Sequence, residues 1–327
     1  MIYKKIIHPI VKANPAKTHK LLTHLGAALS KTAPTRAIVR HVCFYRHPAL
    51  RVTIAGIKFE NPLGLAADFD TKIRIHNILS EVGFGFAEFR STIAQDPQAH
   101  ETTYDAIYED IFKKHAHIKF KIPVGFTIGN AVSTQDMTTE VLNNCKAYDQ
   151  IHPLGDYTTI NVNIPTSNNQ TVNNLQCLEL FLIAIANKPH TKPIFLKIGT
   201  NISQDTMLEL IKIVDQYSWV TGYNVQYDEP IPNNSSIDEF LAQLERIKFM
   251  HAHTNKIIIA CGGSTGQEVY ELLDAGASLV HVVGLLNQGP RAVSKISREL
   301  VSVLHKNGHG SIEMLFIKRN KVDSFTE

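Results

Sequence analysis

Short apolar runs alternate with helix-compatible segments along most of the chain, beginning near residue 52. Eight of these runs are rich in β-branched and aromatic residues and almost continuously apolar, which is typical of parallel strands buried on both faces. Helical periodicity fills the intervals, with helix-start residues at Ser203 and Ser264. We therefore predict strands at Pro62–Ala67, Phe84–Arg90, Ile122–Ile128, Tyr157–Val162, Ile194–Ile198, Val220–Val225, Ile257–Cys261 and Ser278–Val283, and helices such as Thr206–Tyr217, Ile237–Ala252 and Thr265–Ala275.

This alternation predicts an α/β fold, a (β/α)8 TIM barrel over residues 51–304. A doubly wound open sheet is the alternative, but no GxGxxG follows the first strand. In a barrel the chemistry lies at the C-terminal ends of the strands, so those are the positions where we expect a site. Residues 305–327 form a tail without an assigned role, in which the apolar run Met314–Ile317 fits either one more packed turn or a strand.

Residues 1–50 read as a basic, amphipathic helical extension. Two apolar stripes, one within residues 2–11 and one within 21–28, flank an Asn14-Pro15 helix-start signal. Eleven cations precede Glu60, the first acidic residue, so this segment is attracted to anionic surfaces. Two interpretations remain open: the helices bind a membrane surface, or they pack on the barrel as a cover. Without a nucleic-acid motif, we expect no nucleic-acid partner.

Composition narrows the functional classes. The four cysteines share no CxxC spacing, which favours a reduced intracellular compartment. The chain has no apolar run of transmembrane length, and the N-terminus shows no cleavable signal pattern. The sixteen histidines form no ligand set with carboxylates, so we expect no metal site. We expect a cytoplasmic protein that can bind peripherally to the inner face of a membrane through its basic extension.

Several motifs together carry a resemblance that spans nearly the whole chain. They are NPAKTHKL at Asn14–Leu21, NPLGLAA at Asn61–Ala67, Asp70, Gly83–Gly85, Glu88, Ile160-Asn161, LKIG around Lys197, CGG at Cys261–Gly263, DAGASLV at Asp274–Val280 and Gly289-Pro290. In this order, on an eight-strand pattern, they resemble the membrane-associated, quinone-dependent (class 2) dihydroorotate dehydrogenases of pyrimidine biosynthesis. The resemblance implies a serine base that removes the C5 proton of dihydroorotate, hydride transfer from C6 to FMN, and reoxidation by quinone near the N-terminal helices.

The base position departs from this family. After the fourth strand the family pattern is Asn-x-Ser-Ser-Pro-Asn-Thr, whereas this chain reads NVNIPTS from Asn161 to Ser167. Ile164 therefore occupies the position of the base, and it has no lone pair with which to accept a proton. Thr166 or Ser167 is a substitute only if the loop shifts, which the fixed geometry of Pro165 opposes. No residue is assigned as the catalytic base.

The substrate clamp that the resemblance implies is largely replaced. Asn161 survives as a substrate contact, and Lys72 lies one residue from the family's lysine position, which Thr71 occupies. Gln226-Tyr227 stands where the family has Thr-Asn, and a phenol does not offer the paired donor and acceptor of an amide. Asn161 also fits an ordinary barrel-mouth residue that satisfies backbone groups.

The cofactor site is partly kept. The resemblance places FMN against Ala66, Ala67, Ser91, Asn161, Lys197, Gly262, Gly263 and Gly284. Lys197 inside a barrel needs an anionic partner, either the flavin or Asp68 as a salt bridge. We thus hold two hypotheses: an inactive or repurposed homologue with weak or absent dihydroorotate oxidation (a pseudoenzyme), or a working, divergent FMN-dependent oxidoreductase. Quinone and a membrane surface are the partners expected at the N-terminal helices.

Overall fold

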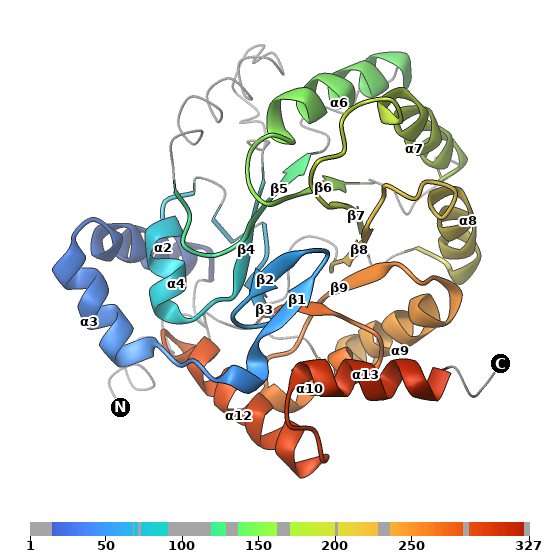
Figure 1. Cartoon of the computed structure of the whole chain (residues 1–327). Helices are drawn as coiled ribbons and strands as arrows, with labels where there is room; N and C mark the ends of the chain where they lie inside the picture. Colours follow the sequence, from blue (N-terminus) through green and yellow to red (C-terminus); the bar gives the residue numbers. More distant parts are fainter. Residues whose placement is uncertain are drawn as a thin grey trace.

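A computed structural model of the chain describes residues 15–67, 69–70, 73–90, 119–128, 137–161, 171–199, 202–227, 236–283 and 288–323. Eight parallel strands close into a barrel in the order β10-β3-β4-β5-β6-β7-β8-β9 (Figure 1). Each predicted strand contains one of them, so the (β/α)8 barrel is confirmed. The strands are β3 Leu63–Leu65, β4 Phe86–Arg90, β5 Val124–Ile128, β6 Tyr157–Asn161, β7 Ile194–Ile198, β8 Gly222–Val225, β9 Ile257–Cys261 and β10 Leu279–His281.

Helices surround the barrel, and several begin at strong capping residues. Ser203 caps α8, as predicted, and Ser236 forms a reciprocal capping box with Glu239 at the start of α9. The start predicted at Ser264 falls one residue later, where Thr265 caps α10. The outer helices are α4 His76–Val82, α6 Met137–Ile151, α7 Thr171–Ile185, α8 Gln204–Val214, α9 Ile237–His253, α10 Gly266–Asp274 and α12 Ala292–Lys306.

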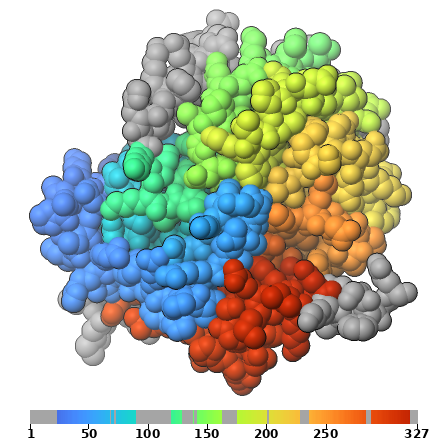
Figure 2. All heavy atoms as spheres, viewed as in Figure 1, coloured from blue at the N-terminus to red at the C-terminus, as the bar shows by residue number. Residues whose placement is uncertain are grey.

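Both ends of the chain add elements to the barrel. The helices α2 (Pro15–Ser30) and α3 (Ala33–Cys43), here called the hood, pack beside α4. The 3-10 helix η2 (Pro48–Leu50) and a hairpin of β1 (Val52–Ile54) and β2 (Ile57–Phe59) follow. The tail forms a helix, α13 (Ile312–Asp323), which contacts α10 and η2. In Figure 2 the segment that includes η2 and the hairpin (blue) and the C-terminal helices (red) lie side by side on one face.

Aromatic rings and glycines fill the N-terminal part of the barrel. Phe86 and Tyr157 are buried, and each ring covers a glycine of the neighbouring strand. A Cβ added to Gly64 would lie 2.2 Å from the Phe86 ring, and one added to Gly125 would lie 2.1 Å from the Tyr157 ring. Phe59 of the hairpin meets Phe86 edge-on at 5.6 Å between ring centroids. The hairpin therefore closes the end of the barrel at which the strands begin.

Cations hold the connections at this same end. The ammonium group of Lys192 donates to the carbonyl oxygens of Pro153, Leu154 and Gly155, and that of Lys256 donates to Tyr217 and Val220. The guanidinium of Arg319, from α13, donates to Leu273 and Ala277. The carbonyls lie at or just beyond the C-terminal ends of α6, α8 and α10, where an added donor helps to satisfy them and a positive charge suits the negative end of a helix dipole. These hydrogen bonds stabilise the loops at the end of the barrel where the strands begin.

Gly125→Ala tests the ring-over-glycine packing. We expect the free energy of unfolding, measured by urea denaturation, to fall by about 1–3 kcal/mol because the new methyl group overlaps the Tyr157 ring. In a Tyr157→Leu background the same change should cost much less, since the ring is gone. An equal cost in both backgrounds would contradict the packing argument.

Candidate active site at the C-terminal mouth of the barrel

The polar residues of four strands point into the barrel. Glu88 of β4 accepts a hydrogen bond from the side-chain amide of Asn224 on β8 at 2.8 Å. Because β4 and β8 are not neighbours in the barrel, this bond crosses the lumen. Asn224 is in register with Lys197 of β7, and Lys197 with Asn161 of β6. Residues paired in register share a face of the sheet, so Asn161 and Lys197 also face the lumen.

Both oxygens of the Glu88 carboxylate accept hydrogen bonds. Thr127 donates to Oε1 at 2.7 Å, and Thr159 and Asn224 donate to Oε2 at 3.0 and 2.8 Å. All four residues are almost fully buried. A buried carboxylate is tolerable only with such donors, which the surrounding strands supply. The layer continues through Gln226 to His281, which makes this lumen far more polar than the branched aliphatic filling usual in such barrels.

Tyr157, a buried residue of β6, lies below this layer and does not offer a base. Burial raises the pKa of Tyr157 well above its ordinary value, and the Glu88 carboxylate raises it further. The phenol therefore stays protonated at neutral pH and has no proton-accepting form there. Its depth at the first position of β6 also separates it from the mouth.

The turn after β9 has the backbone expected of a phosphate-binding turn. Gly262 and Gly263 have φ values of +147° and +78°, which favour glycine. A Cβ on Gly263 would lie 2.8 Å from the side chain of Val269. The turn leads into α10, where the Glu268 carboxylate accepts the backbone N–H of Ser264 at 2.6 Å. A glycine turn that enters a helix N-terminus suits an anionic group.

A phenol stands beside that turn. Tyr227 forms a small buried cluster with Cys261 and Val283. Its hydroxyl oxygen lies 3.4 Å from the place that a Cβ on Gly262 would take. Tyr227, which was predicted to replace a clamp amide, thus puts an aromatic ring against the glycine turn after β9.

The predicted site residues divide into two groups. The structure brings Asn161 and Lys197 together and places Ala66 and Ala67, both buried, directly after β3. Gly262 and Gly263 directly follow β9. In the closed barrel β9 and β3 are both neighbours of β10, so one strand separates the two glycines from Ala66 and Ala67. Ser91, Gly284, Lys72 and Ile164 lie outside the described residues, and so does Asp68, so the roles predicted for them stay predictions.

An apolar cavity of about 280 Å³ lies between the hood and the barrel. Its lining is hydrophobic apart from the Cys43 thiol, whose pKa burial raises. Leu65, one residue before Ala66, forms part of the wall, so the cavity reaches the strand end where the cofactor is expected. The hood contributes Leu25, Leu29, Val39 and Cys43, and the barrel contributes Leu65, Phe69, Ile75, Leu79, Phe84 and Val293 among others.

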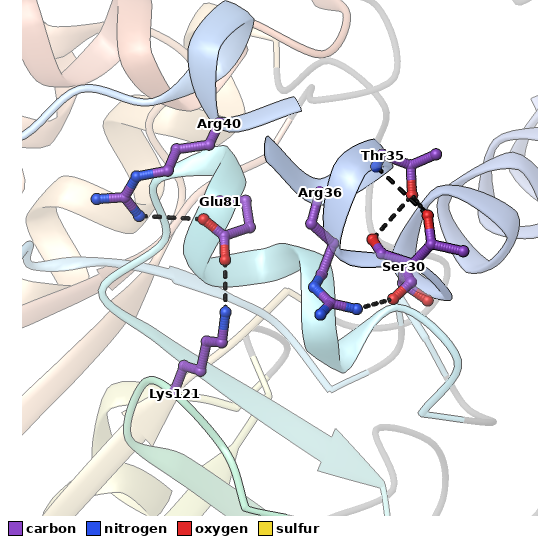
Figure 3. Close-up of polar contacts among 7 residues, drawn as sticks. Ser30, Thr35, Arg36, Arg40, Glu81 and Lys121 are labelled. Atoms are coloured by element: carbon purple, nitrogen blue, oxygen red, sulfur yellow. Dashed lines mark hydrogen bonds and ion pairs between the residues drawn. The ribbon is translucent and has the colours of Figure 1, made fainter. Parts of the chain in front are cut away.

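One buried carboxylate ties the hood to the barrel (Figure 3). Glu81 of α4, with a side chain 6% exposed, accepts from Arg40 of α3 at 3.0 Å and from Lys121, just before β5, at 2.7 Å. Burial alone would raise the pKa of Glu81, but the hydrogen bonds from Lys121 and Arg40 outweigh it and lower that pKa. Arg36 donates to the Ser30 carbonyl and fixes the turn between α2 and α3.

The basic segment at the N-terminus is partly neutralised. Arg46 and Arg51 both pair with Glu60, as Arg40 pairs with Glu81. Leu25, Ile38 and Val42 of the hood are exposed, so its outer face is apolar as well as basic. Within the described ranges, no helix is long and apolar enough to cross a membrane, and no cluster of His, Cys, Asp and Glu has the makings of a metal site.

Comparison with known proteins confirms the resemblance. No protein-family model matches the chain. The dihydroorotate dehydrogenase (quinone) of Helicobacter acinonychis is 27% identical, covering 96% of this chain and 98% of that protein. The enzymes of the same name from Sulfurimonas denitrificans (28% identical, 82% and 85% covered) and Natronomonas pharaonis (24%, 94% and 97%) are also similar. A dihydroorotate dehydrogenase structure from Eimeria tenella, in complex with ferulenol, has the same fold, with a TM-score of 0.69, 18% identity, and 91% and 94% covered.

Glu81→Gln tests the junction between hood and barrel. We expect unfolding free energy to fall by about 1–2 kcal/mol, because two half-exposed cations lose a buried carboxylate, and hydrogen exchange of α3 to accelerate. The depressed pKa means that the ionised form contributes above the ordinary value of 4.5 and that its contribution is lost as pH falls through the folded-state value. The difference between the two proteins should therefore shrink as the pH falls below 4.5.

Glu60→Gln is the matched control, because that carboxylate also pairs with two cations, Arg46 and Arg51, but is 53% exposed. It should change stability by less than about 0.5 kcal/mol. A Glu81→Gln effect of the same size at every pH would count against an ionic junction.

Proposed function

We propose that this protein is an FMN-binding barrel of the quinone-dependent dihydroorotate dehydrogenase type in which dihydroorotate oxidation is weak or absent. The observation that carries the proposal is a contrast at the mouth of β6. Asn161 and Lys197 match the family pattern and lie in register on neighbouring strands. Three residues beyond Asn161, however, the chain has Ile164 at the position where the reaction needs a proton acceptor. The relatives at 24 to 28% identity support the reaction class.

Residues present at the mouth fit FMN. Gly262 and Gly263 suit the phosphate, the small side chains of Ala66 and Ala67 leave room for a flat ring, and Lys197 supplies a cation. The side-chain oxygen of Gln226 is buried and accepts no hydrogen bond from the described residues, which leaves an acceptor for a ligand. Ser91 and Gly284 complete the proposed set. FMN, when bound, supplies a hydride acceptor.

The same mouth is poorly equipped for dihydroorotate. Removal of the C5 proton requires a base within hydrogen-bond reach, and Ile164 has none to offer. Tyr227 packs against Cys261 and Val283 in place of an amide, so it does not present a paired donor and acceptor to a carboxylated pyrimidine. Asn161 and Lys72 are the substrate contacts that we propose to remain. Loss of both base and clamp removes proton transfer and positioning together.

The apolar cavity beneath the hood supports a quinone partner. Its lining of aliphatic and aromatic side chains suits an apolar ring with an isoprenoid tail, and its wall includes Leu65 of β3, the residue before Ala66. The exposed Leu25, Ile38 and Val42, on a segment rich in cations, support contact with a membrane surface. We propose a cytoplasmic protein bound peripherally at the inner face of a membrane, with residues 1–50 as the contacting unit, 51–304 as the barrel and 305–327 as a tail.

A working FMN oxidoreductase is the second candidate. Two features favour it. One is the apolar cavity beneath the hood, and the other is the layer of polar side chains around Glu88 in the lumen, because a barrel that binds no ligand could fill these positions with aliphatic side chains. Such an enzyme would either oxidise dihydroorotate through a base that the family pattern does not identify, or act on another substrate, which would account for the altered clamp.

The visible spectrum of the purified protein, with and without added FMN, tests both candidates. We expect bound flavin bands that dithionite bleaches, and bleaching by dihydroorotate slowed by about a hundredfold or more relative to an enzyme with a base. A colourless protein that leaves the spectrum of FMN unchanged would exclude the cofactor. Rapid bleaching by dihydroorotate would establish the second candidate.

Val39→Trp tests the cavity. An indole there fills space needed by a quinone, so reoxidation of dithionite-reduced flavin by a short-chain ubiquinone should slow by at least about tenfold while flavin content stays constant. Ile38→Trp is the matched control, because the neighbouring Ile38 is 64% exposed and does not line the cavity. Equal reoxidation rates in the two variants would place the quinone elsewhere.

A further inference from the structure

A chain of side-chain hydrogen bonds runs from the middle of the barrel to the mouth. Asn224 donates to the Glu88 carboxylate at 2.8 Å, and the Gln226 amide donates to the side-chain oxygen of Asn224 at 3.2 Å. Gln226 also contacts Nδ1 of His281 at 3.3 Å. Glu88, Asn224, Gln226 and His281 are all 0% exposed. The chain thus links β4, β8 and β10 inside the lumen.

The carboxylate sets the direction of every bond in this chain. An ionised carboxylate only accepts, so the group of Asn224 that faces Glu88 is its NH₂ and the group that faces Gln226 is its oxygen. Gln226 must then direct its own NH₂ toward Asn224 and His281. An amide NH₂ only donates, so Nδ1 of His281 is the acceptor in this contact. Neither amide is free to flip.

The consequence is an acceptor with a fixed orientation at the top of the chain. The Gln226 oxygen is buried and has no hydrogen-bond donor within the part of the chain that the structure describes. Folded proteins leave few such atoms unpaired, because the loss of water is not compensated. Gln226 follows the last residue of β8, at the end of the barrel where the ligand is expected.

We propose that the Gln226 side-chain oxygen accepts the ring N–H of a cyclic imide, and that Glu88 and Asn224 are positioning residues that hold it in that orientation. The proposal rests on the proposed function, since both ligands named there carry such an N–H flanked by carbonyls: the isoalloxazine ring of FMN and the dihydropyrimidine ring. A glutamine locked as an acceptor favours an N–H donor and disfavours a ring that offers only carbonyl oxygens.

Binding of FMN and of N3-methyl-FMN, followed by flavin fluorescence, tests the proposal. Wild-type protein should bind FMN about tenfold more tightly than the N3-methyl form if the flavin is the donor, and Gln226→Met should remove that preference. If the pyrimidine is the donor, both flavins bind alike and Gln226→Met instead weakens orotate, measured by its perturbation of the flavin spectrum, by about tenfold.

Gln243→Met is the matched control. Gln243 is also buried, and its amide donates to the carbonyls of Val225 and Cys261 on the α9 side of the barrel rather than into the lumen. It should lower stability without altering either preference. Glu88→Gln keeps the shape of the anchor but removes its acceptor-only character, so it should weaken the same preference as Gln226→Met. If Glu88→Gln fails to fold, Asn224→Leu tests the same link from the next residue.

The outcomes separate the two proposals. Wild-type protein that binds no flavin would overturn the proposed function and this inference together. Protein that binds flavin, but in which Gln226→Met behaves as Gln243→Met toward both flavins and orotate, would overturn the inference alone. A third outcome is that Gln226→Met loses the ligand preference while Glu88→Gln and Asn224→Leu both retain it in full. That outcome would support Gln226 as the acceptor but overturn the positioning role of Glu88 and Asn224.

Discussion

The burial of a carboxylate inside a closed parallel barrel is the constraint on which the mouth of this protein depends. Glu88 has no access to water, so its stabilisation must come from donors on strands around the lumen. Thr127, Thr159 and Asn224 supply them from β5, β6 and β8. Positions that would normally hold aliphatic side chains are thereby committed to polar ones, and the set is interdependent: removal of one donor leaves charge uncompensated.

The two ends of the barrel are specialised in different ways. At the end where strands begin, aromatic rings cover glycines, and Lys192, Lys256 and Arg319 saturate loop carbonyls. At the end where the strands finish, the side chains of amides and a lysine lie near glycine turns and form the candidate active site. The hood adds a third region, joined to the barrel by a buried carboxylate and bordered by an apolar cavity. The contacts that stabilise the barrel and the candidate ligand site thus lie at opposite ends, as expected for this fold.

The sequence was sufficient to predict the barrel because each strand is a short, nearly continuous apolar run, a signal that needs no knowledge of its neighbours. The hairpin was missed, although Ala55 and Gly56 at its turn both adopt positive φ as a two-residue turn requires. The lumen network was missed for a different reason. Glu88, Asn224 and His281 are isolated polar residues in separate strands, and only the closed register shows that they meet. Local patterns do not encode such contacts.

The placement of Arg319 also has a bearing on how the chain is made. Barrel closure requires β10, the last strand of the ring, to pair with β3, the first, and the turn that leads into β10 is held by an arginine of α13. During synthesis the ring is therefore complete only after β10 has emerged, and its final turn is secured only once α13 has followed. Until then the edges of β3 and of the growing sheet are unpaired, and unpaired strand edges are the feature of incomplete chains that favours misassembly.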